Sequence, residues 1–242
     1  EIRALGTEAV AALSSGAVKG LTSAAVRGFS SEQVAALTTE QVSALTSVQL
    51  ASITTAAIGG METEDVGVLS SAQVAALGSA QVRALSSEQI GAIGTQVIGA
   101  LTTSQIRSIS SDALAGFSTE QIARITSAQV GAFTTGQIRG FSTEQIGGFA
   151  TGALRAFNSQ QLRGLSSDQV AALTTEQAVA LSSLQLGSLS TEAFGGFETQ
   201  DLAVLTSGQV IGFGTKEIGA LGTEDVAALS SGAVKGLTSA AV

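Results

Sequence analysis

Two short acidic stretches are the residues whose types and spacing could support chemistry. Glu62, Glu64 and Asp65 form the first stretch, and Glu198 and Asp201 form the second. Carboxylate oxygens grouped in this way could hold a hard cation such as Ca²⁺. Their spacing, however, matches neither an EF-hand loop nor a glycine–aspartate nonapeptide repeat, and acidic side chains at a helix start are favourable without metal. We therefore assign no metal-binding residue.

The residue types that most often carry catalysis are absent. The chain contains no His, Cys, Trp or Tyr, which removes the usual general base at neutral pH, thiolate nucleophiles and soft metal ligands. Ser and Thr are plentiful, but no base accompanies them, and the glycines form no phosphate-binding loop. We predict that the protein is not an enzyme, and we assign no catalytic residue, no cofactor-binding residue and no cofactor.

Charge and hydropathy limit the classes of partner. The formal net charge is −8 and the pI is about 4.5, which argues against nucleic acid, because nucleic-acid binding needs clustered Lys and Arg. We find no signal peptide and no apolar run of membrane-spanning length, so we predict no transmembrane helix. The absence of Cys fits a secreted protein that avoids disulfides. The expected partners are the chain itself, through head-to-tail or lateral assembly, and a cell surface or glycan.

The whole sequence follows an eight-residue period, so each residue can be assigned to one of eight positions. If Leu5 is position 1, an octad begins at every eighth residue up to Leu237, which makes thirty octads without insertion or deletion. Position 1 is large and apolar, position 3 is always Ser or Thr, and position 6 is Val, Ile, Leu or Phe except at Ala178. Gln is the commonest residue at position 5, and position 8 is usually small. A fixed period of this kind indicates a repeat architecture.

The period requires one bend per octad. Eight residues of continuous helix return about 80° out of phase, and positions 1 and 6 of a flat strand would face opposite sides. We predict a helix of five or six residues in each octad, with its N-cap at position 3. The alternative places the cap at position 2, with Gln at position 5 completing a capping box and positions 1 and 6 forming a hydrophobic staple. Ala150 and Glu62 at position 2 favour the first choice.

Small residues at positions 7 and 8 are expected to end each helix. Glycine would relax the backbone there, and a small side chain would let the next coil approach closely. Positions 1 and 6 would then point inward. We predict an all-α solenoid of very short helices, one per octad; the alternative is a β-solenoid with strands joined by Ser/Thr turns. Residues 1–242 are expected to be one uninterrupted solenoid and a window of a longer array, since no polar capping repeat is visible.

Longer repeats lie on top of the octads. Residues 37–71 resemble 173–207, a separation of 136 residues, and residues 5–26 return at 221–242 with Asp225 in place of Ala9. Duplication by recombination explains both, and the alternative is that the 216-residue period matches a geometric repeat of an assembly. Phenylalanine gathers at position 1 in the middle of the chain, where we expect it to fill the core: Phe117, Phe133, Phe141, Phe149 and Phe157.

Two runs carry a resemblance to known repeats. FSSEQVAALTTEQVSAL (29–45) and LSSDQVAALTTEQ (165–177) resemble the L-[ST]-[ST]-x-Q-[VI]-x-A octapeptide repeats of very large, often adhesin-like proteins that Gram-negative bacteria secrete or display. The resemblance covers the whole chain and implies an extracellular or cell-surface location, with no catalytic residues. We predict a structural repeat protein that builds an extracellular filament, tube or surface stalk by self-assembly. The alternative is an adhesin or ligand-binding surface module that Ca²⁺ could assist.

Overall fold

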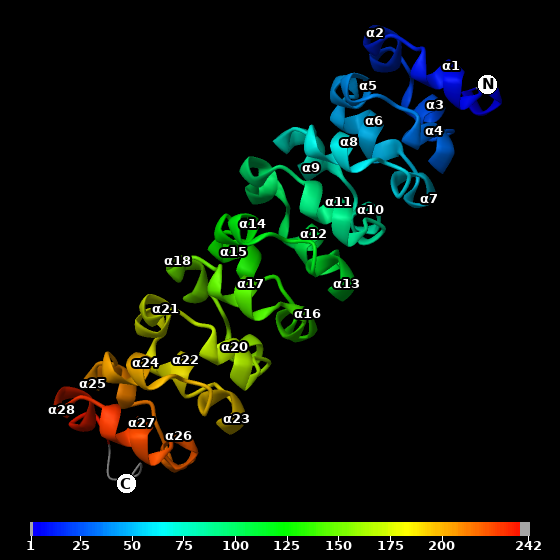
Figure 1. Ribbon diagram of the computed structural model, residues 1–242. Coiled ribbons are helices and arrows are strands. Elements are labelled where there is room, and N and C mark those ends of the chain that lie inside the picture. The colour runs from blue at the N-terminus through cyan, green and yellow to red at the C-terminus, as the bar shows by residue number, and fades with distance from the viewer. Residues whose placement is uncertain (1, 238–242) are drawn as a thin grey trace. The chain divides into compact units, whose positions relative to one another are not determined.

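The chain is helical throughout the part that the structure describes. The computed structural model describes residues 2–237, and in this range every regular element is a short α-helix or 3₁₀-helix and no strand occurs (Figure 1). The prediction of an all-α solenoid is therefore confirmed, and the β-solenoid alternative is wrong. Ser239 and Val242, at positions 3 and 6 of the last octad, lie outside the described residues. None of the described helices is long and apolar enough to cross a membrane.

Two compact units divide the chain, residues 1–121 and 122–242. The first contains η1 (Ile2–Ala4), α1 (Thr7–Ala11), α2 (Ser15–Lys19), α3 (Ser23–Val26), α4 (Ser31–Ala35), α5 (Thr39–Ala44), α6 (Ser47–Ser52), α7 (Thr55–Ile58), α8 (Thr63–Gly67), α9 (Ser71–Ala76), α10 (Ser79–Arg83), α11 (Ser87–Ala92), η2 (Thr95–Ala100), α12 (Thr103–Ser108) and α13 (Ser111–Leu114). The second contains α15 (Ser127–Val130), α16 (Thr135–Gly140), α17 (Thr143–Gly147), α18 (Thr151–Leu154), α19 (Ser159–Leu162), α20 (Ser167–Ala171), α21 (Thr175–Ala180), α22 (Ser183–Leu186), α23 (Thr191–Phe194), α24 (Thr199–Ala203), α25 (Ser207–Val210), α26 (Thr215–Ala220), α27 (Thr223–Ala228) and α28 (Ser231–Val234). Helix α14 (Thr119–Ala123) contains the boundary. One uninterrupted solenoid over residues 1–242 stays a prediction.

Each described α-helix starts at position 3, and its N-cap is the residue at position 2. In α4, the Ser30 hydroxyl accepts a hydrogen bond from the Gln33 N–H at 3.2 Å, and the Gln33 Oε1 accepts one from the Ser30 N–H at 3.0 Å. This reciprocal capping box recurs along both units. The preferred prediction of a cap at position 3 is therefore wrong, and the alternative is correct. Ala150 and Glu62 occupy cap positions without a side-chain cap bond.

The helices end without any left-handed residue. No glycine in residues 2–237 has a positive φ, so glycine does not relax the backbone there, contrary to the prediction. The helix ends instead because position 1 turns extended, as at Leu45 with φ −59° and ψ 133°. This extended residue leads directly into the next N-cap. The chain therefore bends once per octad, as predicted, through a short extended link.

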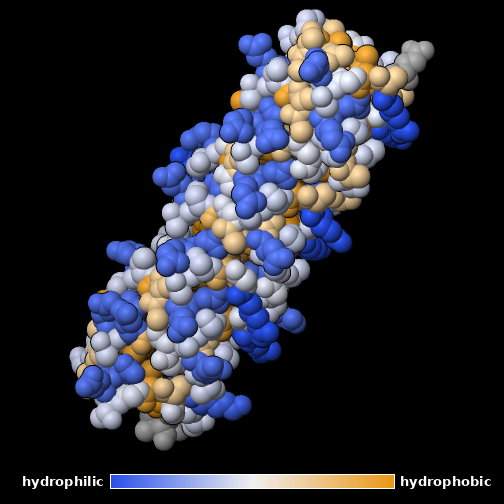
Figure 2. Space-filling model, turned by 45° about the vertical axis from the view of Figure 1, so that its right-hand side comes forward, coloured by the Kyte–Doolittle hydropathy of each residue, from blue (hydrophilic) through white to orange (hydrophobic). Residues whose placement is uncertain are grey.

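Positions 1 and 6 form the core of both units. In the octad of α5, Leu37 and Val42 are buried, and the same two positions are buried in most other octads. Ile122 and Val130, at position 6, are completely buried. Figure 2 shows that hydrophilic side chains dominate the visible surface, with apolar ones between them. The prediction that positions 1 and 6 point inward is confirmed.

Successive turns of each unit stack on one another. A helix contacts the helix three octads further along: α2 contacts α5 and α6 contacts α9 in the first unit, and α20 contacts α23 in the second. Some contacts are very close. A Cβ added to Gly60 would lie 2.2 Å from the Ser31 carbonyl oxygen, and one added to Gly116 would lie 1.8 Å from that of Ser87. Glycine at position 8 is therefore required at these points, as the close-approach prediction stated.

Candidate functional site

The side chains that hold the turns together are the glutamines at position 5. The Nε2 of Gln81 donates to the carbonyl oxygens of Leu50 at 3.0 Å and Ile53 at 2.8 Å, which belong to the preceding turn. Its Oε1 accepts from the Gly78 N–H at 2.7 Å in its own helix. One buried amide thus completes a helix cap and joins two turns. We call such a residue an inter-turn glutamine.

The offset of this contact is constant. The carbonyl 28 residues before the glutamine is an acceptor in every case, together with one that lies 31 or 30 residues before it, or with both. A 28-residue offset is three and a half octads, so the amide meets the junction between two octads. The same contact occurs in both units, at Gln33, Gln41, Gln49, Gln73, Gln81, Gln89, Gln105, Gln121, Gln161, Gln169, Gln177, Gln185 and Gln209.

Burial of these amides is tolerated because their hydrogen bonds are made. Gln105 and Gln121 are each 1 % exposed, and a buried amide without partners would cost several kcal/mol. Gln105 donates to Val74 and Leu77 at 2.7 Å each and accepts from the Thr102 N–H at 2.6 Å. The position-5 column is therefore a specific polar network inside an apolar stack, and it fixes which turn meets which.

Two aspartates break this network. Asp65 in α8 and Asp201 in α24 occupy position 5, and they are 2 % and 1 % exposed. One carboxylate oxygen of each, Oδ2, is buried and has no hydrogen-bond partner. An ionised carboxylate can only accept hydrogen bonds, whereas the glutamine that it replaces donates them. Position 5 is also Ala in several octads, Val97 in one, and Glu217 and Asp225 near the C-terminal end, but among the described residues Asp65 and Asp201 are the acidic members of the column that are buried.

The pKa values of both aspartates are raised, as expected for buried carboxyl groups. Burial raises the pKa of Asp65 to about 6, and the negative charge of Glu62 adds to the effect. Burial also raises the pKa of Asp201; the Thr175 hydroxyl, which donates to Asp201 Oδ1 at 2.9 Å, opposes this increase. Both acidic stretches noted in the sequence thus contain one buried carboxyl group. Among residues 2–237, however, no three acidic side chains converge where they could hold a metal ion.

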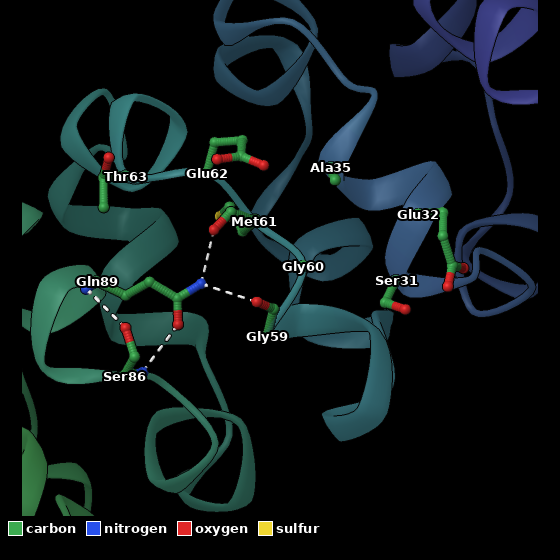
Figure 3. Close-up of a pocket in the computed structure, with 10 residues that line it drawn as sticks. All are labelled: Ser31, Glu32, Ala35, Gly59, Gly60, Met61, Glu62, Thr63, Ser86 and Gln89. Atoms are coloured by element: carbon green, nitrogen blue, oxygen red, sulfur yellow. Dashed lines mark hydrogen bonds between the residues drawn. The ribbon is translucent and has the colours of Figure 1, made fainter.

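A groove of about 420 Å³ lies beside the first stretch (Figure 3). Glu62 stands on one side and Glu32 on the other, and Gln89 closes its base by donating to the carbonyl oxygens of Met61 and Gly59. Hydrogen bonds from the Ser30 hydroxyl, its own N–H and the Ser31 hydroxyl lower the pKa of Glu32. Because Glu32 is ionised at neutral pH, the groove suits a cationic group rather than an anion.

Nearly the same residues recur 136 positions later, with Asp in place of one Glu. Ser31, Glu32, Gly60, Glu62 and Thr63 correspond to Ser167, Asp168, Gly196, Glu198 and Thr199. The local geometry also recurs, because a Cβ on Gly196 would lie 2.2 Å from the Ser167 carbonyl oxygen, the same distance as for Gly60 and Ser31. Each unit therefore holds one copy of an acidic surface next to a buried aspartate.

The phenylalanines form a stack inside the second unit. Phe133 and Phe141 meet edge to face with ring centroids 5.1 Å apart, and Phe149 and Phe157 do so at 5.5 Å. All of these rings are buried, so they fill the core as predicted. Phe117, in the first unit, is also buried.

Sequence reasoning missed the function of position 5. The sequence signal for that function is the frequency of Gln at position 5. Asp65 and Asp201 depart from it, and by themselves they indicate only two acidic stretches. The frequency alone does not identify the partners, because the acceptor carbonyls lie in another turn. A comparison of position 5 across the octads marks both aspartates as departures from Gln, together with several alanines, Val97, Glu217 and Asp225, so it does not by itself single them out.

Comparison with known proteins identifies the repeat. A family model described as the ALTTAQ repeat matches residues 18–47, 46–79, 58–95, 74–103, 91–127, 147–183 and 194–231. No curated protein matches the chain significantly. The chain itself contains ALTTEQ at 36–41 and 172–177, which places Gln at position 5 of the octad. Because the matched segments together cover more than half of the chain, the protein belongs to the ALTTAQ repeat family.

Proposed function

We propose that this repeat scaffold is a non-enzymatic structural element of an extracellular filament, tube or surface stalk. The observation that carries the proposal is the constant inter-turn contact of the position-5 glutamines. Gln41 bonds Val10 and Leu13 in the first unit, and Gln169 bonds Ile138 and Phe141 in the second at the same offsets. A contact that repeats unchanged with every turn sets no limit on the length of the stack.

The contact also has a direction. Each inter-turn glutamine donates toward the N-terminal side of the stack, so one face of a turn presents amide donors and the other presents carbonyl acceptors. Position 5 of the first three octads is Ala9, Ala17 and Ala25, so a head-to-tail contact between two copies would rest on the apolar residues at positions 1 and 6 rather than on these amides. Heterologous contacts of this kind produce open filaments, or rings where the rotation closes.

The extracellular or cell-surface location is part of the proposal. It is supported by the resemblance to the octapeptide repeats of secreted and surface proteins. The lack of cysteine fits a compartment in which thiols would oxidise.

Electron microscopy and light scattering test assembly. The 242-residue chain is compared with a version that carries a polar capping octad at each end. We expect the uncapped chain to form regular fibres in negative stain and the capped chain to stay monomeric. A monodisperse monomer at high concentration without caps would contradict the proposal. Equal assembly of the two proteins would show lateral contacts, and the surface positions 4 and 7 would then be substituted.

The acidic groove favours a second candidate, a ligand-binding surface module. Glu32 and Glu62 flank the groove without a basic residue in its lining. In this case a discrete monomer should bind a cell surface or glycan saturably, and Glu32→Gln with Glu62→Gln should abolish that binding. Unchanged binding in the double variant would exclude the groove.

A further inference from the structure

Among the described residues, Asp65 and Asp201 are the buried acidic residues of the position-5 column, whereas Glu217 and Asp225 at the same position are partly exposed. At Gln73, the neighbour of Asp65 in the column, the amide donates to Val42 and Leu45, which lie 31 and 28 residues earlier. The same offsets from Asp65 lead to Val34 and Leu37. Where position 5 is Gln, the carbonyl groups equivalent to those of Val34 and Leu37 accept hydrogen bonds from its side-chain amide.

In the second unit the register gives the same result. Gln209, one octad after Asp201, donates to Ala178 at 3.2 Å and Leu181 at 2.9 Å. The same offsets from Asp201 lead to Val170 and Leu173. In both units, therefore, an ionised carboxylate would lie in a buried site beside carbonyl oxygens. Both groups can only accept hydrogen bonds, so the site lacks a donor.

Protonation supplies that donor, because a protonated carboxyl group can donate through its O–H. We propose that Asp65 and Asp201 are proton-binding sites that join adjacent turns. In the acid form the carboxyl group donates to a carbonyl of the preceding turn and replaces the glutamine amide. In the ionised form this contact is lost and the two turns are held less firmly.

The charges around Asp65 all favour the protonated form. Helix α8 packs against α5 and α11. The charged residues on these elements are Glu40 on α5, Glu88 on α11, and Glu62 and Glu64 beside Asp65 itself. None of the three helices carries Lys or Arg, so no cation stabilises the carboxylate.

Asp201 has similarly charged surroundings, although its Oδ1 also accepts from the Thr175 hydroxyl at 2.9 Å, a contact that the ionised form keeps. Helix α24 packs against α21 and α27. The charged residues there are Glu176 on α21, Glu224 and Asp225 on α27, and Glu198 at the cap of α24. The substitutions also recur as a set, since Glu at position 2, Asp at position 5 and Val at position 8 occur together in both octads.

The direction of the pH effect follows from the pKa of Asp65. Its pKa in the folded chain is raised to about 6 from an ordinary value of 3.8. A group whose folded pKa is raised contributes stability that is complete below its unfolded pKa and is lost as the pH rises through its folded pKa. The contribution of Asp65 is therefore largest below about pH 4 and absent above about pH 7.

Urea unfolding of the full chain at pH 7.5 and pH 5 tests the proposal. Asp65→Asn with Asp201→Asn supplies a donor at every pH, and Asp112→Asn with Asp168→Asn is the control, since both of these residues are exposed at position 4. We expect the unfolding midpoint of the wild type and the control to rise on acidification. The Asp65→Asn, Asp201→Asn variant should lose most of that rise. An equal rise in all three proteins would overturn the proposal.

Carbon-13 NMR of the five aspartate carboxyl groups gives a second measurement that does not depend on unfolding. With aspartate-selective labelling, Asp65 and Asp201 should titrate above the ordinary range, and each Asn variant should remove one such resonance. Titration of all five near pH 4 would contradict the proposal. Stabilisation of the wild type but not of the Asp65→Asn, Asp201→Asn variant by CaCl₂ at pH 7.5 would show that the sites take a metal ion, which also overturns it.

Discussion

The position-5 glutamine combines two contacts that proteins usually divide between different residues. Its oxygen caps the helix that contains it, and its nitrogen bonds the backbone of the preceding turn, as Gln49 does with Thr46 and with Val18 and Leu21. The first contact is local and follows from the capping-box pattern. The second could not be predicted, because an offset of 28 to 31 residues depends on how far the chain rotates at each bend.

Loss of one inter-turn glutamine should weaken the stack measurably. Gln81→Ala removes two donors to carbonyls and the only side-chain acceptor for the Gly78 N–H. We expect the free energy of unfolding to fall by about 2–4 kcal/mol, because buried groups would lose their partners. Gln96→Ala, at an exposed position 4, is the control. Chemical denaturation measures both, and equal midpoints would show that the inter-turn bonds contribute nothing.

At the scale of the helix, the sequence predicted the type of the element but not its first residue, and the predicted length of five or six residues is too long for helices such as α3 and α15, which have four. Ser and Thr at position 3 are invariant, which suggested a cap, whereas the cap is the more variable position 2. The reason is that the position-5 amide also caps the helix. At Gly78, position 2 has no side chain, and the helix still forms because the Gln81 Oε1 accepts from the Gly78 N–H. Invariance at position 3 therefore reflects something other than capping; in α15, for example, the Ser127 hydroxyl donates to the Gly152 carbonyl oxygen in the next turn.

Two glycine substitutions should have opposite effects on the helices. Gly116→Ala places a Cβ 1.8 Å from the backbone oxygen of Ser87, so the turns must separate, at a cost of about 1–3 kcal/mol. Gly152→Ala, inside α18, meets nothing within 4 Å and should stabilise by about 0.5–1 kcal/mol through helix propensity. Thermal melts followed by circular dichroism measure both changes. Equal melting temperatures for the two variants would show that the close approach of Gly116 to the Ser87 carbonyl oxygen does not require glycine.

At the scale of the whole molecule, the eight-residue period was sufficient to predict an all-α solenoid with positions 1 and 6 inside. It was not sufficient to give the number of octads per turn, since small changes at each extended link accumulate. It also could not show that Asp65 and Asp201 would be buried. Their burial follows from the stacking of turns, whereas their acidity suggests an exposed surface when the sequence is read locally.

The repeated contacts predict low cooperativity. The main long-range contacts between the described helices of a unit join neighbouring turns, so each turn is stabilised mainly by those beside it. In differential scanning calorimetry we expect a broad transition whose van't Hoff enthalpy is well below the calorimetric enthalpy. A ratio of one would mean that the 242 residues unfold as one cooperative body. The double Gln81→Ala, Gln169→Ala variant, which weakens both units, should widen the transition further.

The half-octad offset also governs how the solenoid would respond to tension. The Gln81 amide donates to Leu50 in one octad and to Ile53 in the next. It therefore bridges the link between two consecutive octads of the preceding turn. A force along the stack is therefore shared between two octads at each glutamine, and the links between octads are not aligned from one turn to the next. Failure should therefore release one turn at a time. Each released turn of about 28 residues would lengthen the chain by roughly 100 Å, giving evenly spaced peaks in a single-molecule force trace.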